Sequence, residues 1–182
     1  MMISELQRRT FSERGLIRID RLLPDETVAP ARDLALQDLE QQGVWRDGDW
    51  LADVPANWEL ARRLLRSLRR RTRDSSAYKD LVTAPLLEAV RGLVDGRAVH
   101  ALTNRPQLLF TPPNATEWTV PHKIWHLDAP RLGEVGLPGV QMFAFLDAVA
   151  TGAGGTLVVA GSHRLLNHRG RIRSKDAKRL LK

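Results

Sequence analysis

Two residues separated by a single position carry the clearest chemical signal in the sequence, His126 and Asp128 in the tetrapeptide Trp125-His126-Leu127-Asp128. On a β-strand, residues i and i+2 project from the same face, so the imidazole and the carboxylate can converge on one cation at about 2.0–2.2 Å. Two histidines and one carboxylate form the facial triad of non-haem iron(II) sites. The spacing alone is a weak signal, because a chain with five histidines contains His-x-Asp by chance in about one case in three. The alternative is a surface strand on which His126 and Asp128 form an ion pair without a metal.

The elements that would position this pair change character along the chain. Apolar residues recur with a period near 3.6 in the first half, and Thr83 with Pro85 forms a helix start. A short strand is expected at Leu16–Ile19, and Val44–Pro55 has the composition of a loop. The expected helices span Pro24 to about Gly43, Asn57–Arg73, and Thr83 to about Gly96.

After Gly96 the sequence consists of short apolar or alternating runs separated by Pro, Gly and Asn, which is typical of strands. Helices followed by strands predict an α+β fold with a mainly β core, a sandwich or jelly roll with helices packed outside it. The expected strands are Val99–Leu102, Gln107–Phe110, Lys123–Leu127, Val140–Leu146 and Thr156–Ala160.

The net charge of +7 is confined to one end of the 182-residue chain. Residues 162–182 hold eight basic residues and one acidic residue, which accounts for all of it. The chain has no cysteine, no run of about eighteen apolar residues and no signal peptide at its start, so we expect a cytoplasmic protein without a membrane segment.

Three segments between Pro106 and Leu165 resemble the phytanoyl-CoA dioxygenase family: PQLLFTPPNATEWTVPHKIWHLD, GVQMFAFLDAV and GAGGTLVVAGSHRL. The N-terminal FSERGLIRIDRLLPDE is similar to the family's opening strand and first helix. The resemblance implies a double-stranded β-helix, the jelly roll of cupin-like proteins. It also implies an iron(II)- and 2-oxoglutarate-dependent dioxygenase that hydroxylates a small organic molecule with molecular oxygen.

Site residues follow from the resemblance position by position. His126 and Asp128 would be catalytic metal ligands, and Gln107 and Phe143 would contact 2-oxoglutarate from strands beside the metal. The alternatives are a strand-edge cap for Gln107 and a core position for Phe143. The carboxylate of Asp128 favours hydroxylation over halogenation, because related halogenases have a small residue there.

The family pattern requires a third ligand, a histidine on a late strand, and then an arginine for the far carboxylate of 2-oxoglutarate. Neither is found before Lys182, so we expect a truncated jelly roll that holds iron weakly and has poor activity. The other histidines are poor substitutes. The resemblance implies that His163 is structural or near the pocket rather than a ligand, and His122 would lie about 13 Å along the strand from His126. The remaining two are His100, expected in a core strand, and His168, expected in a loop.

We therefore expect a single domain over 1–182, with a helical part over about 1–96 and a partial jelly-roll core over about 97–164. Residues 165–182 are either a basic tail or the start of an insert. A second interpretation is a catalytically inactive truncated remnant that serves as a binding module. A third is a nucleic-acid binder that uses the basic tail and the seven arginines of Asn57–Arg73, but the chain lacks a recognisable reading motif. For these arginines the favoured alternative is a solvated helix face, because acidic residues elsewhere balance their charge. The sequence leaves the oligomeric state open.

Overall fold

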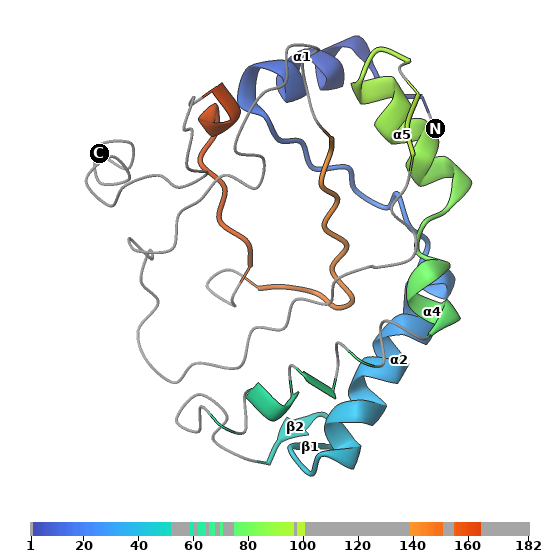
Figure 1. The fold of residues 1–182 in the computed structure, drawn as a ribbon, viewed down its shortest axis with the longest axis vertical. Helices are drawn as coiled ribbons and strands as arrows, with labels where there is room; N and C mark the ends of the chain where they lie inside the picture. The colour runs from blue at the N-terminus through green and yellow to red at the C-terminus, as the bar shows by residue number, and fades with distance from the viewer. Residues whose placement is uncertain are drawn as a thin grey trace, which may run out of the picture.

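The computed structural model describes residues 2–51, 59, 62–64, 66, 67, 70, 75–96, 98–100, 139–150 and 155–164. Within these ranges the elements are helices, one two-stranded sheet and a short 3₁₀ turn, η1 (Ser162–Arg164) (Figure 1). The described part of the chain contains no helix with the length and apolar character needed to cross a membrane.

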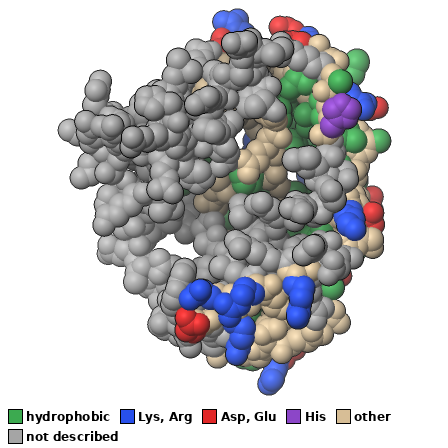
Figure 2. Space-filling model, in the orientation of Figure 1, with side chains coloured by type: hydrophobic (Ala, Val, Ile, Leu, Met, Phe, Trp, Pro, Cys, Tyr) green, Lys and Arg blue, Asp and Glu red, His purple; other side chains and the backbone are tan. Residues whose placement is uncertain are grey.

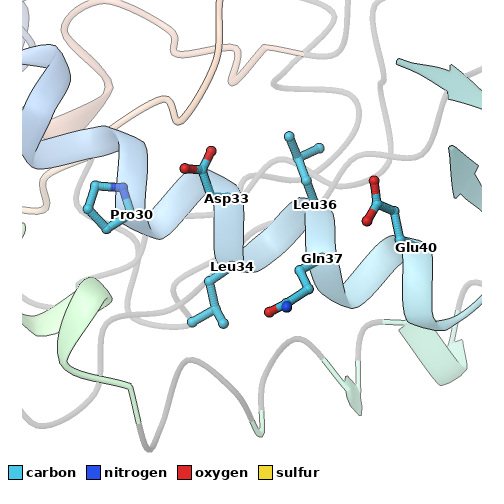
Figure 3. Close-up of a pocket in the computed structure, with 6 residues that line it drawn as sticks. All are labelled: Pro30, Asp33, Leu34, Leu36, Gln37 and Glu40. Atoms are coloured by element: carbon cyan, nitrogen blue, oxygen red, sulfur yellow. The ribbon is translucent and has the colours of Figure 1, made fainter. Parts of the chain in front are cut away.

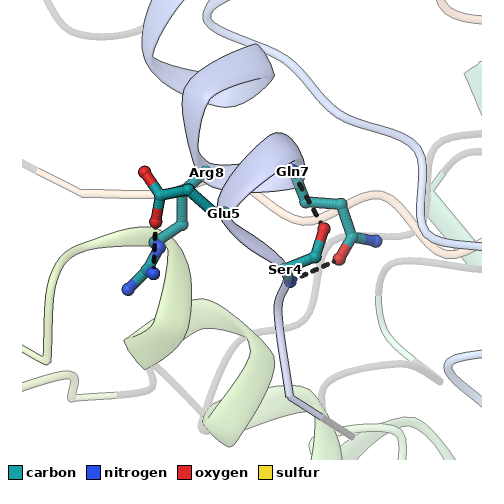
Figure 4. Close-up of polar contacts among 4 residues, drawn as sticks. All are labelled: Ser4, Glu5, Gln7 and Arg8. Atoms are coloured by element: carbon teal, nitrogen blue, oxygen red, sulfur yellow. Dashed lines mark hydrogen bonds and ion pairs between the residues drawn. The ribbon is translucent and has the colours of Figure 1, made fainter.

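Helix α1 (Glu5–Arg14) begins with a reciprocal pair of hydrogen bonds that the sequence interpretation missed. The Gln7 amide donates to Ser4 Oγ at 3.2 Å, and the Ser4 amide donates to Gln7 Oε1 at 2.8 Å (Figure 4). This capping box satisfies two amides that have no partner within the helix. Glu5, in the first turn, forms an ion pair with Arg8 at 2.5 Å. The helix ends at Gly15, whose φ of 73° is the left-handed conformation that favours glycine.

Helix α5 (Ala84–Leu93) lies beside α1 (Figure 1). Its start is the predicted one: the Thr83 hydroxyl accepts a hydrogen bond from the Leu86 amide at 3.3 Å, and Pro85 lies in the first turn. The buried face of the helix follows the helical period. Its members are Leu86, Ala89, Val90 and Leu93.

Helix α2 (Asp25–Gln41) confirms the helix predicted from Pro24 to about Gly43. It contacts the short helix α4 (Ser76–Lys79), whose Tyr78 is buried, and it leads directly into the sheet. The described residues between positions 59 and 70 are all helical, in agreement with the prediction for Asn57–Arg73. Their Leu64 is fully buried and packs in one cluster with Leu39 and Val44.

The predicted loop over Val44–Pro55 is wrong at its centre, where β1 (Trp45–Arg46) and β2 (Asp49–Trp50) form an antiparallel hairpin. Asp47 and Gly48 both have positive φ, 53° and 93°, as a two-residue turn requires. The paired Trp45 and Trp50 rings meet edge to face at 5.3 Å between centroids, and both pack on the Leu39 cluster. The hairpin thus extends the core of α2.

No strand forms at Leu16–Ile19, at 140–146 or at 156–160 with any residue that the structure describes. Figure 1 draws 139–150 and 155–160 as two long lengths of chain without helix or strand. The second of them leads into η1, near α1. Of the five strands predicted after Gly96, Gln107–Phe110, Lys123–Leu127 and half of Val99–Leu102 fall in 101–138, outside the described residues. The jelly roll therefore stays a prediction.

Candidate functional site

Three of the four predicted site residues, His126, Asp128 and Gln107, lie outside the described residues. The convergence of the imidazole and the carboxylate on one cation is therefore a prediction from strand periodicity. Phe143 is described, and its side chain is 43% exposed.

Apolar side chains are exposed at successive positions in the segments around Phe143. Adjacent residues of a strand point to opposite sides, so a half-buried strand hides every second residue. Here successive residues are exposed, and soluble proteins rarely leave such a patch uncovered. The predicted inward position of Phe143 is not seen among the described residues, where its side chain is exposed. Its contact with 2-oxoglutarate stays a prediction. The exposed side chains are Met142, Phe143, Phe145, Val149, Leu157 and Val158.

The Gly161-Ser162-His163 motif docks on the C-terminal end of α1. The Gly161 amide donates to the Arg14 carbonyl at 2.7 Å, and His163 Nε2 lies 3.1 Å from the Ser12 carbonyl. A carbonyl only accepts hydrogen bonds, so Nε2 carries the proton in this contact. These two bonds join segments about 150 positions apart in the sequence.

Gly15 makes the docking possible. A Cβ atom at this position would come within 3.0 Å of three atoms of the His163 ring. The ring therefore occupies the space that a side chain at residue 15 would fill. Since its Nε2 contacts the Ser12 carbonyl and its Nδ1 is buried, His163 has a structural role here, which is one of the two roles that the resemblance implies for this position.

The other histidines give no second candidate for a metal ligand in the described structure. His100 is exposed, and the expectation of a buried core histidine is wrong for it. His122 and His168 lie outside the described residues. No group of three or more metal-binding side chains gathers among the residues that the structure describes.

A buried polar network joins α2 to the described residues between 59 and 70. Asp38 is fully buried, and its Oδ1 accepts a hydrogen bond from the Ser67 hydroxyl at 3.0 Å. The same hydroxyl accepts from Gln42 Nε2 at 3.3 Å. A buried carboxylate needs such donors, because burying a charge without hydrogen-bond partners costs far more than burying a neutral polar group. The network is therefore part of the core rather than a reactive centre.

An open hollow of about 570 Å³ lies along α2, and every described residue that lines it comes from this helix: Pro30, Asp33, Leu34, Leu36, Gln37 and Glu40 (Figure 3).

On α1, the hydrogen bond from Arg9 to Glu13 raises the pKa of the Arg9 guanidinium, and attraction to the Glu13 carboxylate adds to this. Arg9 thus stays charged at physiological pH.

The donor set of the predicted metal pair agrees with iron(II), since imidazole nitrogen and carboxylate oxygen are the donors of the facial triad. The chain offers no thiolate, the ligand that would favour zinc or an iron–sulfur cluster. Comparison with protein-family models, with curated proteins and with solved structures gives no significant match.

Proposed function

We propose that this chain derives from an iron(II)- and 2-oxoglutarate-dependent dioxygenase of the phytanoyl-CoA dioxygenase type that hydroxylates a small organic molecule. The observation that carries the proposal is the His126–Asp128 pair within the stretch Pro106–Leu165. Its support is the spacing, which puts both donors on one face of a strand, and the resemblance of the flanking segments to that family. The proposal includes a double-stranded β-helix over about 97–164 and a cytoplasmic location.

His126 and Asp128 would hold the iron, and Gln107 and Phe143 would contact 2-oxoglutarate. When bound, iron and 2-oxoglutarate supply the activation of molecular oxygen for hydroxylation. The protein's part is to orient the two ligands, to leave coordination positions open and to keep water away from the site. Apolar side chains beside Phe143 suit the last task. With two ligands proposed in this sequence, we expect iron to bind weakly and turnover to be slow.

An anaerobic titration of the chain with Fe(II) and 2-oxoglutarate tests the proposal through the visible charge-transfer absorption of the chelate. We expect the band in the unmodified chain, and a loss of iron affinity above about 100-fold in His126→Ala and in Asp128→Ala. This threshold follows because outer-shell partners of a metal ligand alone contribute about 10–100-fold. His100→Ala is the matched control, because His100 is exposed and has no assigned role.

The same samples exposed to oxygen separate the enzyme from the inactive module by the release of succinate. Succinate that depends on both His126 and Asp128 supports the dioxygenase. A chelate band without succinate supports a binding module that has no activity. A band of equal strength in the unmodified chain and in Asp128→Ala would refute the metal assignment.

A further inference from the structure

Four arginines, Arg62, Arg63, Arg66 and Arg70, form one exposed helical surface that the proposed dioxygenase does not use. We call these four residues the arginine face. Arg62, Arg66 and Arg70 recur every four residues, so they follow each other along the helix at about 6 Å intervals. With Arg63 they cover an arc of about 100°.

The opposite side of the same helical stretch is fixed to the core. Leu64 is fully buried against Leu39 and Val44, and Ser67 donates its hydrogen bond to the buried Asp38. These contacts hold the backbone that carries the arginine face. Among the described residues of this stretch, Leu64 thus faces the core and the four arginines face outward.

Among the residues that the structure describes, one carboxylate pairs with the arginine face. Arg62 pairs with Glu59 at 3.4 Å, and both side chains are more than half exposed. Within the described part of the chain, no carboxylate forms an ion pair with Arg63, Arg66 or Arg70. Figure 2 shows Lys and Arg side chains gathered over the lower part of the molecule, where Figure 1 places the hairpin and the neighbouring helical turns.

We propose that the arginine face binds the phosphate backbone of a nucleic-acid duplex without reading its sequence. A guanidinium matches phosphate geometry with two parallel hydrogen bonds, and a regular row of them suits a polymer of regularly spaced phosphates. Such contacts fix position and carry no sequence information, so no reading motif is needed.

An anionic membrane is the weaker partner for this surface. Helices that bind bilayers insert an apolar face next to their basic one. Here Leu64, the apolar residue of the stretch that the structure describes, is fully buried in the core and is not available to insert. The inference goes beyond the dioxygenase proposal and rests on different residues, so either can fail without the other.

The salt dependence of duplex binding by the full chain tests the inference. Each phosphate that an arginine neutralises contributes about 0.9 to the slope of log K against log salt, so Arg62→Ala with Arg66→Ala and Arg70→Ala should flatten the slope by about 2.7. The matched control removes three exposed arginines elsewhere and should leave the slope unchanged. It combines Arg14→Ala, Arg18→Ala and Arg91→Ala.

Replacing the same three residues of the arginine face by lysine keeps the charges and should preserve the slope. Two duplexes of unrelated sequence should bind with equal affinity. An equal flattening of the slope in the alanine variant and in its control would overturn the inference, because binding would then reflect net charge alone. Binding to phosphatidylserine vesicles without binding to the duplex would overturn it too, in favour of a membrane.

Discussion

Replacing Gly15 by alanine should destabilise the protein through two separable effects. The first is conformational: Gly15 has a φ of 73°, and an L-residue in the left-handed region costs about 1–2 kcal/mol. The second is steric, because the new methyl group would meet the His163 ring. A ring that stays in place is overpacked at about 1–3 kcal/mol, and a ring that moves away gives up its bond to the Ser12 carbonyl, about 1 kcal/mol. The free energy of unfolding should fall by about 2–5 kcal/mol in total.

Gly43 provides the matched control for the conformational effect. Its φ is 71°, nearly that of Gly15, and no described atom lies within 4 Å of the position that a Cβ would take. Gly43→Ala should therefore cost only the left-handed term, about 1–2 kcal/mol. The difference between the two variants isolates the contact with His163.

Urea unfolding, monitored by tryptophan fluorescence and by circular dichroism, measures these free energies. A double-mutant cycle with His163→Ala completes the test. Truncation of His163 removes the steric effect, so the double variant should be more stable than additivity predicts by about 1–3 kcal/mol. Strict additivity, together with equal destabilisation in Gly15→Ala and Gly43→Ala, would refute the docking of His163 on α1.

Three other substitutions test the core and the helix starts, each by the shift of the urea midpoint. Ser67→Ala should cost about 1–3 kcal/mol, because it removes a donor from the buried Asp38, and an unchanged midpoint would contradict that network. Thr83→Ala should cost about 1 kcal/mol because the Leu86 amide is then uncapped, whereas Thr83→Ser should retain most of the stability. Leu64→Ala should cost about 2–5 kcal/mol, since the side chain is fully buried; a cost below about 1 kcal/mol would place Leu64 outside the core.

Local signals in the sequence were sufficient for the helices that have strong periodicity. Helices α2 and α5 lie where their apolar spacing and the Thr83 cap place them. Two elements that were not predicted also have local signals in the sequence. Ser4 and Gln7, with Gly15 after the last turn, mark α1. Asp47-Gly48 between two tryptophans marks the hairpin. Both elements were therefore predictable.

Long-range contacts were not predictable from such signals. Nothing near His163 in the sequence indicates that its ring would lie against Gly15, because the two residues meet only through the tertiary fold. The burial of Asp38 has the same origin, since its partner Ser67 belongs to another helical segment. For His126 and Asp128 the sequence supplies the spacing of the donors, and the convergence of their side chains remains a prediction.

The contacts of residues 161–163 with α1 also bear on the order in which the chain folds. During synthesis the N-terminus leaves the ribosome first, at about 5–20 residues per second, so α1 exists for many seconds before His163 is made. The capping box and Gly15 are local, and α1 can form with them early. Closure of the loop of about 150 residues has a high entropic cost and few local contacts to assist it. We therefore expect the contacts of His163 with the C-terminal end of α1 to form among the last steps of folding. Because Gly15 has no side chain, the space for the His163 ring stays free until then.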